Sequence, residues 1–198
     1  MPWNRVWEHL MLVVIGSSCT IAVGLFLGIL AYLVPKISKV ILWTVDVLQT
    51  VPSLATLGIL MVIFGGGKTT VIIGMVLYSL LPIVRNTYVA LTGVSPAIKE
   101  AACGMGMGRL HRLVLVEFPV AFPIIFTGIR ISTVTSIGVA VFGTFVGGGG
   151  LGDTLYRGIY VQNMQLILFG TAALMVMAVV MDTALNFVEK KLLKRNMK

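Results

Sequence analysis

Five long apolar blocks constrain this chain more than any other feature of its sequence. They cover residues 10–34, 40–64, 69–91, 120–146 and 166–188. The hydrocarbon core of a bilayer is about 30 Å thick, and a helix needs about 20 apolar residues to cross it. Each block is long enough, and none shows the alternation typical of a barrel strand of about 10 residues. The sequence therefore predicts an all-α, polytopic membrane protein with about five transmembrane helices.

The composition agrees with this interpretation. Of the 198 residues, 58% are hydrophobic and 11% are charged, whereas a soluble domain needs more polar surface to cover its core. The first block is too long for a signal-peptide core and lacks an A-x-A pattern behind it, so we interpret it as a span. A cleaved signal is the alternative. No linker or fixed-period repeat divides the chain, which predicts a single transmembrane domain over residues 1–198.

The net charge of +8 follows the loops between the blocks. When the loops are numbered alternately, ten basic residues share one side: Lys36, Lys39, Lys99, Arg109, Arg112, Lys190, Lys191, Lys194, Arg195 and Lys198. Arg5, Lys68 and Arg157 lie on the other side. The positive-inside tendency then predicts a multi-pass protein of a bacterial cytoplasmic membrane, with its N-terminus outside and its C-terminus in the cytoplasm. The charge is explained by topology in a lipid bilayer, so no nucleic-acid partner is expected.

The loop over residues 92–119 is polar and rich in glycine. Ser95 followed by Pro96 is typical of a helix start, so we expect a helix through residues 97–103. Glycine weakens a helix and accepts positive φ, which predicts a break after Cys103. A second short helix is expected over residues 109–118, before Pro119 and Pro123 open the fourth span. The sequence predicts a helix-turn-helix at the membrane surface. The glycines of the turn are Gly104, Gly106 and Gly108.

This loop carries a family resemblance. Glu100-Ala101-Ala102, Gly106, Val116 and Phe118-Pro119 have the spacing of the coupling motif of type I ABC importer permeases. Phe118 stands where the family usually has leucine. The chain resembles this family from its first span to its basic tail. The resemblance implies an architecture like that of the methionine permeases, with a cytoplasmic coupling helix-turn-helix.

Four further segments are similar to osmoprotectant permeases, which import glycine betaine, carnitine or choline. They are residues 46–55, 81–87, 128–130 and 147–153. Import of such compatible solutes is therefore the expected function. Import of methionine or ergothioneine is the alternative within the class. An ATP-independent channel or secondary carrier is the alternative from another class, and it leaves the spacing of residues 100–119 unexplained. A membrane enzyme is a third alternative.

The resemblance also implies partners. Two permease subunits, identical or paralogous, would form the pathway, a cytoplasmic ATPase dimer would hold ATP and Mg, and an extracellular substrate-binding protein would deliver the solute. The tip of the coupling loop would fit a cleft on the ATPase, and closure of the ATPase would draw two such loops together and open the pathway outward. The residues expected at this contact are Glu100, Ala101, Ala102, Gly104 and Gly106.

Four charges lie inside the apolar blocks: Asp46, Arg85, Arg130 and Asp182. A lone charge there costs at least ~3 kcal/mol by insertion scales, so pairing or contact with water is expected. Two acids and two bases at similar depth predict one buried polar cluster near the inner end of the pathway. The cluster either locks the helices together or changes its pairing between inward- and outward-facing states and so biases gating.

The glycine runs mimic nucleotide motifs without their context. The run before Lys68 lacks the earlier glycine of a P-loop, since Val62 stands there, and the run over residues 147–152 has no strand-turn-helix unit. Gly149 and Gly150 are instead predicted to lie in a flexible outer stretch that takes part in gating or contacts the binding protein. The seven acids form no catalytic pair and no metal-ligand spacing is present, so the subunit itself is expected to have no enzymatic activity, cofactor or metal.

Overall fold

The computed structural model describes residues 2–196, which form helices joined by short connections, and these residues include no β-strand. Lys198 of the basic tail lies outside the described residues. Along the chain the elements are α1 (Pro2–Leu33), α2 (Pro35–Thr50), α3 (Ser53–Phe64), α4 (Lys68–Thr92), α5 (Pro96–Gly104), α6 (Arg109–Arg112), the π-helical turn η1 (Leu113–Glu117), α7 (Phe118–Phe142), the 3-10 turn η2 (Gly143–Val146), α8 (Leu151–Tyr160) and α9 (Met164–Asn196).

Four of the described helical segments are long and apolar enough to cross a membrane. They are Trp3–Leu33, Lys68–Thr92, Arg109–Val146 and Met164–Lys194. The pair α2 and α3 adds a fifth span if the two are counted together, although they are bent by 100°. The expected all-α fold with about five spans is confirmed.

The second apolar block is a broken span where the sequence predicts a single helix. Pro52 has no backbone N–H and disfavours helical geometry in the residue before it. Val51 is accordingly extended, with φ −73° and ψ 129°, and α3 starts only at Ser53. The break leaves α3 as a separate short helix beside α4 and η2.

The fourth span begins earlier than predicted. The expected boundary at Pro119 is absent because α6, η1 and α7 run on without a break from Arg109 to Phe142. The π-helical turn explains this continuity: the Phe118 N–H donates to the Leu113 carbonyl five residues back, and Pro119 falls in the first turn of α7. The loop helix is thereby joined directly to a membrane span.

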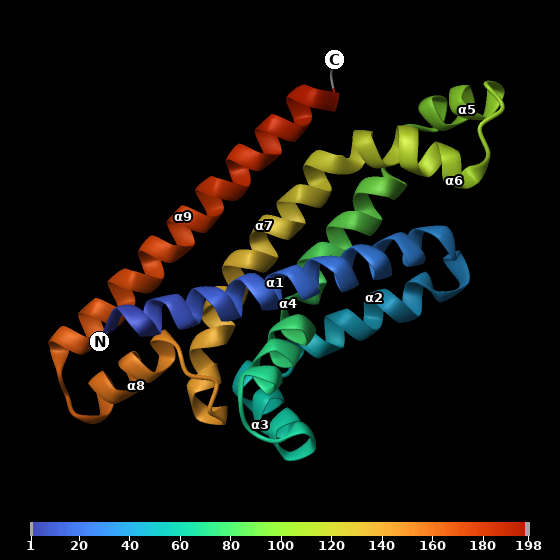
Figure 1. Ribbon diagram of the computed structural model, residues 1–198. Coiled ribbons are helices and arrows are strands. Elements are labelled where there is room, and N and C mark those ends of the chain that lie inside the picture. The colour runs from blue at the N-terminus through green and yellow to red at the C-terminus, as the bar shows by residue number, and fades with distance from the viewer. Residues whose placement is uncertain (1, 197–198) are drawn as a thin grey trace.

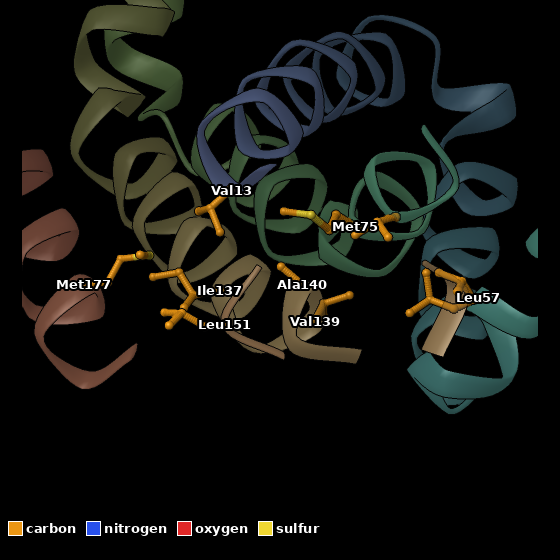
Figure 2. Packing of buried hydrophobic residues seen from close by; sticks show 10 residues of the cluster. Val13, Leu57, Met75, Ile137, Val139, Ala140, Leu151 and Met177 are labelled. Carbon is orange, nitrogen blue, oxygen red and sulfur yellow. The ribbon is translucent and has the colours of Figure 1, made fainter. Parts of the chain in front are cut away.

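The centre of the molecule is the packing of α1 and α7 on α4. One buried cluster lies around Val13, Met75 and Ile137, and Figure 2 shows these side chains on neighbouring helices, with Leu57 of α3 farther along the same layer. A second cluster, which includes Leu91 and Leu113, lies toward α5. The two clusters make α1, α4 and α7 one packed unit.

Figure 1 shows that the two ends of this unit differ. The short helices α5 and α6 and the C-terminus of α9 lie at one end, which we call the α5 end. The N-terminus, α3 and α8 lie at the other, which we call the α8 end. The packed helices therefore connect two structurally distinct surfaces.

Close approach of α1 to α4 depends on glycine in α1. A Cβ atom at Gly24 would lie 2.8 Å from Ile83 Cγ2, and one at Gly28 would lie 2.6 Å from Thr87 Cβ. Small residues at such contacts are the usual means of close helix packing in membranes. Gly138 of α7, in contrast, has open space at its Cβ position.

The variant Gly28→Ala should therefore unfold at a lower temperature than the parent protein. Overpacking of a tight contact costs about 1–3 kcal/mol, and here Thr87 and the Val84 carbonyl both stand in the way. Thermal unfolding of the detergent-solubilised protein measures the effect. Gly138→Ala is the control and should leave the midpoint unchanged or raise it. Equal midpoints for the two variants would contradict the packing argument.

Candidate functional site

Helix α5 forms where local chemistry places it. Pro96 stands in its first turn, and the Ser95 carbonyl accepts hydrogen bonds from the N–H groups of Ile98 and Lys99 at 3.1 and 3.2 Å. The Ser95 side chain makes no capping hydrogen bond. The predicted start of the helix at Ser95 and Pro96 is confirmed, whereas the capping hydrogen bond expected from the Ser95 side chain is absent.

The end of α5 is a tight glycine turn. The Gly106 N–H donates to the Cys103 carbonyl at 2.9 Å, and the Met107 N–H donates to the Ala102 carbonyl at 3.1 Å. This is the Schellman arrangement, which needs a left-handed residue after the helix. Gly106 supplies it with φ +79°. Glycine is required at this position because other residues rarely adopt that conformation.

The five residues predicted at the coupling contact divide between two faces. Ala102 is buried, and the other four, Glu100, Ala101, Gly104 and Gly106, are exposed. A Cβ atom at Gly104 or Gly106 would meet nothing within 4 Å. The tip is thus a small knob with free space around it. Exposed apolar side chains of Ile98, Met105 and Leu110 flank it, and such a patch marks an interaction surface.

Two basic side chains attach the loop to the helices beneath it. Lys99 Nζ donates to the Leu91 carbonyl at 3.0 Å, at the C-terminal end of α4, and lies 5.2 Å from the ring centroid of Tyr32. Arg109 donates to the Leu33 carbonyl at the end of α1 at 2.5 Å. Cations at helix C-termini satisfy free carbonyls and oppose the helix dipole. The knob is therefore held to α1 and α4.

The four charges within the apolar blocks form two separate pairs. Arg85 of α4 binds Asp46 of α2 through two hydrogen bonds, of 3.2 and 2.6 Å. Arg130 of α7 binds Asp182 of α9 in the same way, at 3.0 and 2.9 Å. The pairing is confirmed by these contacts. The prediction of one buried cluster is wrong, because the pairs join different helices.

The pairs are also less buried than expected. The side chains of Asp46 and Arg85 are 36% and 57% exposed, and those of Arg130 and Asp182 are 28% and 42% exposed. Glu189 lies directly after the fifth apolar block, and its Oε2 is 3.5 Å from Arg130 Nη1. Sequence reasoning missed Glu189, although its position seven residues after Asp182 puts both on one helix face.

A polar groove adjoins the second pair. It has a volume of about 640 Å³ and lies between α7 and α9, where Arg130 and Asp182 share its lining with apolar side chains and with three hydroxyl groups. The hydroxyls belong to Thr127, Thr135 and Thr183. The hydroxyls of Thr127 and Thr135 already donate to carbonyls of their own helix, so the charges of Arg130 and Asp182 are the groups in this groove that hydrocarbon would not solvate.

The glycine run at the α8 end is a packed turn. Gly149 and Gly150 both have φ +78°, and the Gly150 N–H donates to Glu8 Oε2 at 3.1 Å. A Cβ atom at Gly149 would lie 2.8 Å from the Glu8 carboxylate, and one at Gly150 would lie 3.0 Å from His9 Nδ1. The predicted flexible stretch is thus held against the first turns of α1.

Charged side chains form a network of ion pairs at the same end of the molecule. Glu8 pairs with Arg5 at 2.9 Å and with Lys68 of α4 at 2.8 Å, and Arg5 also reaches Asp153 of α8 at 3.1 Å. Thr144 donates to Asp153 at 2.5 Å. Two acids and two bases thus tie α1, α4 and α8 together. No sequence motif pointed to this network, because Lys68 and Asp153 are far along the chain from Arg5 and Glu8.

The comparisons with known proteins agree with this architecture. Residues 20–194 match the family described as binding-protein-dependent transport system inner membrane component. The chain belongs to this family. The resemblance drawn from the coupling motif is thereby confirmed.

Named relatives share most of their length with this chain. The glycine betaine/carnitine/choline transport system permease protein OpuCD of Bacillus subtilis is 39% identical over 190 residues, which cover 96% of this chain and 83% of the relative. The choline transport system permease protein OpuBB of the same species is 36% identical, covering 95% and 87%. The osmoprotectant import permease protein OsmW of Salmonella typhimurium is 36% identical, covering 92% and 87%.

Solved structures share the fold. A chain of the inward-facing MetNI methionine ABC transporter superposes with a TM-score of 0.83 at 22% identity, covering all of this chain and 97% of the other. An amino acid ABC transporter gives a TM-score of 0.75 at 17% identity, covering 92% and 90%. The expected type I importer architecture is confirmed.

Gly149→Ala should destabilise the turn at the α8 end. An L-residue in the left-handed region costs roughly 1–2 kcal/mol, and the new methyl group would press on the Glu8 carboxylate. Thermal unfolding of the purified protein measures the loss. Gly104→Ala, at a glycine with open space, is the control. An unchanged midpoint for Gly149→Ala would contradict the packed turn.

Proposed function

We propose that this chain is the permease subunit of an ATP-driven, binding-protein-dependent importer for compatible solutes such as glycine betaine, carnitine or choline. The observation that carries the proposal is the 39% identity, over 96% of the chain, to a permease named for these solutes. Methionine is less supported as cargo, because the methionine transporter shares the fold at only 22% identity. No comparison favours ergothioneine.

The α5 end is the proposed docking surface for the ATPase dimer, which would hold ATP and Mg. Glu100, Ala101, Gly104 and Gly106 present a small, exposed knob there, and Ala102 seats it on the body of the subunit. The alanine and glycine positions of the knob would let its backbone approach the wall of a cleft closely. ATP hydrolysis would belong to the partner, so this subunit would convert the motion of the ATPase into opening of the pathway.

The proposed orientation places the α5 end in the cytoplasm and the α8 end outside. Lys190, Lys191 and Lys194 lie in the C-terminal part of α9, which ends near the level of α5 in Figure 1. This clustering of basic residues supports the positive-inside assignment. The extracellular substrate-binding protein would then approach the α8 end.

The pathway is proposed to form between two permease subunits, either identical or paralogous. The α7–α9 groove is exposed in the single subunit and contains charges within otherwise apolar helices. A second subunit and water would complete its surroundings. The Arg130–Asp182 pair and the Asp46–Arg85 pair are proposed to bias gating. Their ion pairing would differ between the inward- and outward-facing states. Gly149 and Gly150 would hold the outer turn closed against α1.

Solute uptake should require the permease, its ATPase, ATP and the binding protein together. Proteoliposomes that contain the permease and its ATPase should accumulate glycine betaine, carnitine or choline only with internal ATP and external binding protein. Uptake without ATP would favour a channel or secondary carrier and overturn the proposal. The ligand bound by the cognate binding protein would identify the solute.

Ala101→Trp should prevent docking of the ATPase. The indole would enlarge a knob whose exposed side is otherwise small, so it would no longer fit a matching cleft. We expect the ATPase to be lost during co-purification and uptake to disappear, while the permease still folds. Ala55→Trp, the same change at an exposed site on α3 at the α8 end, is the control and should retain the ATPase. Retention by Ala101→Trp would remove the docking assignment.

The two intramembrane pairs should affect coupling. Arg130→Gln leaves Asp182 and Glu189 without their partner, and Asp46→Asn leaves Arg85 without its partner. Substitutions within coupled networks change coupling by about 0.5–2 kcal/mol. The expected result is an altered ratio of solute imported to ATP hydrolysed, measured in proteoliposomes. Normal assembly, ATPase stimulation and transport in both variants would show that the pairs do not bias gating.

A further inference from the structure

The α5 knob needs a firm connection to a membrane span if its displacement is to move the pathway. Of the nine residues of α5, only Ala102 is buried. Lys99 and Arg109 hold the loop to carbonyls at the ends of α4 and α1. Neither of these contacts involves α7. This span contains Arg130 and forms one side of the groove between α7 and α9.

Arg112 makes the connection to α7. Its Nε donates to Glu117 Oε1 at 2.5 Å, and its Nη1 is in contact with Cys103 Sγ. Cys103 belongs to α5, and Glu117 ends the π-helical turn that continues into α7. Arg112 and Glu117 both belong to the continuous helix from Arg109 to Phe142, so the contact between this helix and α5 is the one from Arg112 to Cys103, while Glu117 fixes the guanidinium in place. We name these three residues the α5–α7 clasp.

The Glu117 end of the clasp is buried and charged. The Glu117 side chain is 1% exposed, and Arg112 is 19% exposed. Within residues 2–196, Glu117 Oε2 has no hydrogen-bond partner. A carboxylate in such a place is costly unless it is paired, so loss of Arg112 would leave an uncompensated buried charge. Arg112 is therefore the charged partner that compensates the buried Glu117 carboxylate.

The helix that contains Arg112 is anchored in the hydrophobic core. Leu113, next to Arg112 in the chain, is buried in the same cluster as Leu91, Val94 and Ala121. The π-helical turn between Leu113 and Glu117 carries the chain into α7 without a break. Turns of this kind are frequent at functional sites in helices. A pull on α5 would thus pass through Arg112 into α7 instead of bending a free loop.

We propose that Arg112 is a positioning residue that transmits the displacement of α5 to α7, and that Cys103 and Glu117 are its two attachment points. This inference rests on the proposed function, because it names how the ATPase contact is coupled to the pathway. The guanidinium suits the task since its fixed fork reaches two acceptors at once, which the single ammonium of lysine does less well.

The test measures coupling in proteoliposomes that contain the full permease–ATPase complex, with glycine betaine as solute and its binding protein outside. Arg112→Lys keeps the charge but loses the fork. We expect the complex to assemble and to retain basal ATP hydrolysis, while the solute imported per ATP and the stimulation by loaded binding protein fall severalfold. Lys39→Arg, an exchange of the same two residue types at an exposed site on α2, is the control and should match the parent complex.

Cys103→Ala and Cys103→Ser give a second test that leaves the pair of Arg112 and Glu117 intact. The alanine variant removes the α5 attachment and should lower the solute-to-ATP ratio, and the serine variant, which still offers an acceptor, should recover part of it. A parental ratio in both Arg112→Lys and Cys103→Ala would overturn the inference. If Arg112→Lys fails to assemble, the ratio of the alanine variant decides. Should the parent complex show no ATP-dependent uptake, the proposed function fails instead.

Discussion

The constraint on which this structure depends is that a bilayer does not solvate polar groups. Backbone amides inside it must bond to one another, which makes helices of the apolar blocks. Charged side chains inside it must find partners, and Asp46, Arg85, Arg130 and Asp182 do so across neighbouring helices. What remains polar and open is therefore informative. In this chain it is the groove between α7 and α9 and the two ends of the helical unit.

The two ends are built from different chemistry. At the α8 end, two acids and two bases tie α1, α4 and α8 together, and glycines with positive φ bring the turn over residues 147–150 into contact with Glu8 and His9. His9 is fully buried, and its Nε2 donates to the Ile137 carbonyl of α7. At the α5 end, three basic side chains of the loop make separate contacts. Lys99 binds the end of α4, Arg109 binds the end of α1, and Arg112 binds Glu117.

The packed unit of α1, α4 and α7 connects these two ends mechanically. Gly24 and Gly28 let α1 approach α4 so closely that an added methyl group would overlap its neighbours. Tightly packed interiors move as bodies and deform little. A displacement that enters α7 at Glu117 would thus pass along the helix toward Arg130 and the groove.

Local signals in the sequence determined the parts of this protein that depend on neighbouring residues. The apolar lengths set the helical class, Pro96 set the start of α5, and Gly106 set the turn that follows it, because each acts on its own stretch of backbone. The coupling spacing indicated the family for the same reason. Only the tertiary structure decided which charges meet, since the members of the two intramembrane pairs are 39 and 52 residues apart. It also decided that Pro52 breaks a span while Pro119 does not, because the π-helical turn accommodates Pro119, and that Arg112 lies between α5 and α7, where only the fold can place it.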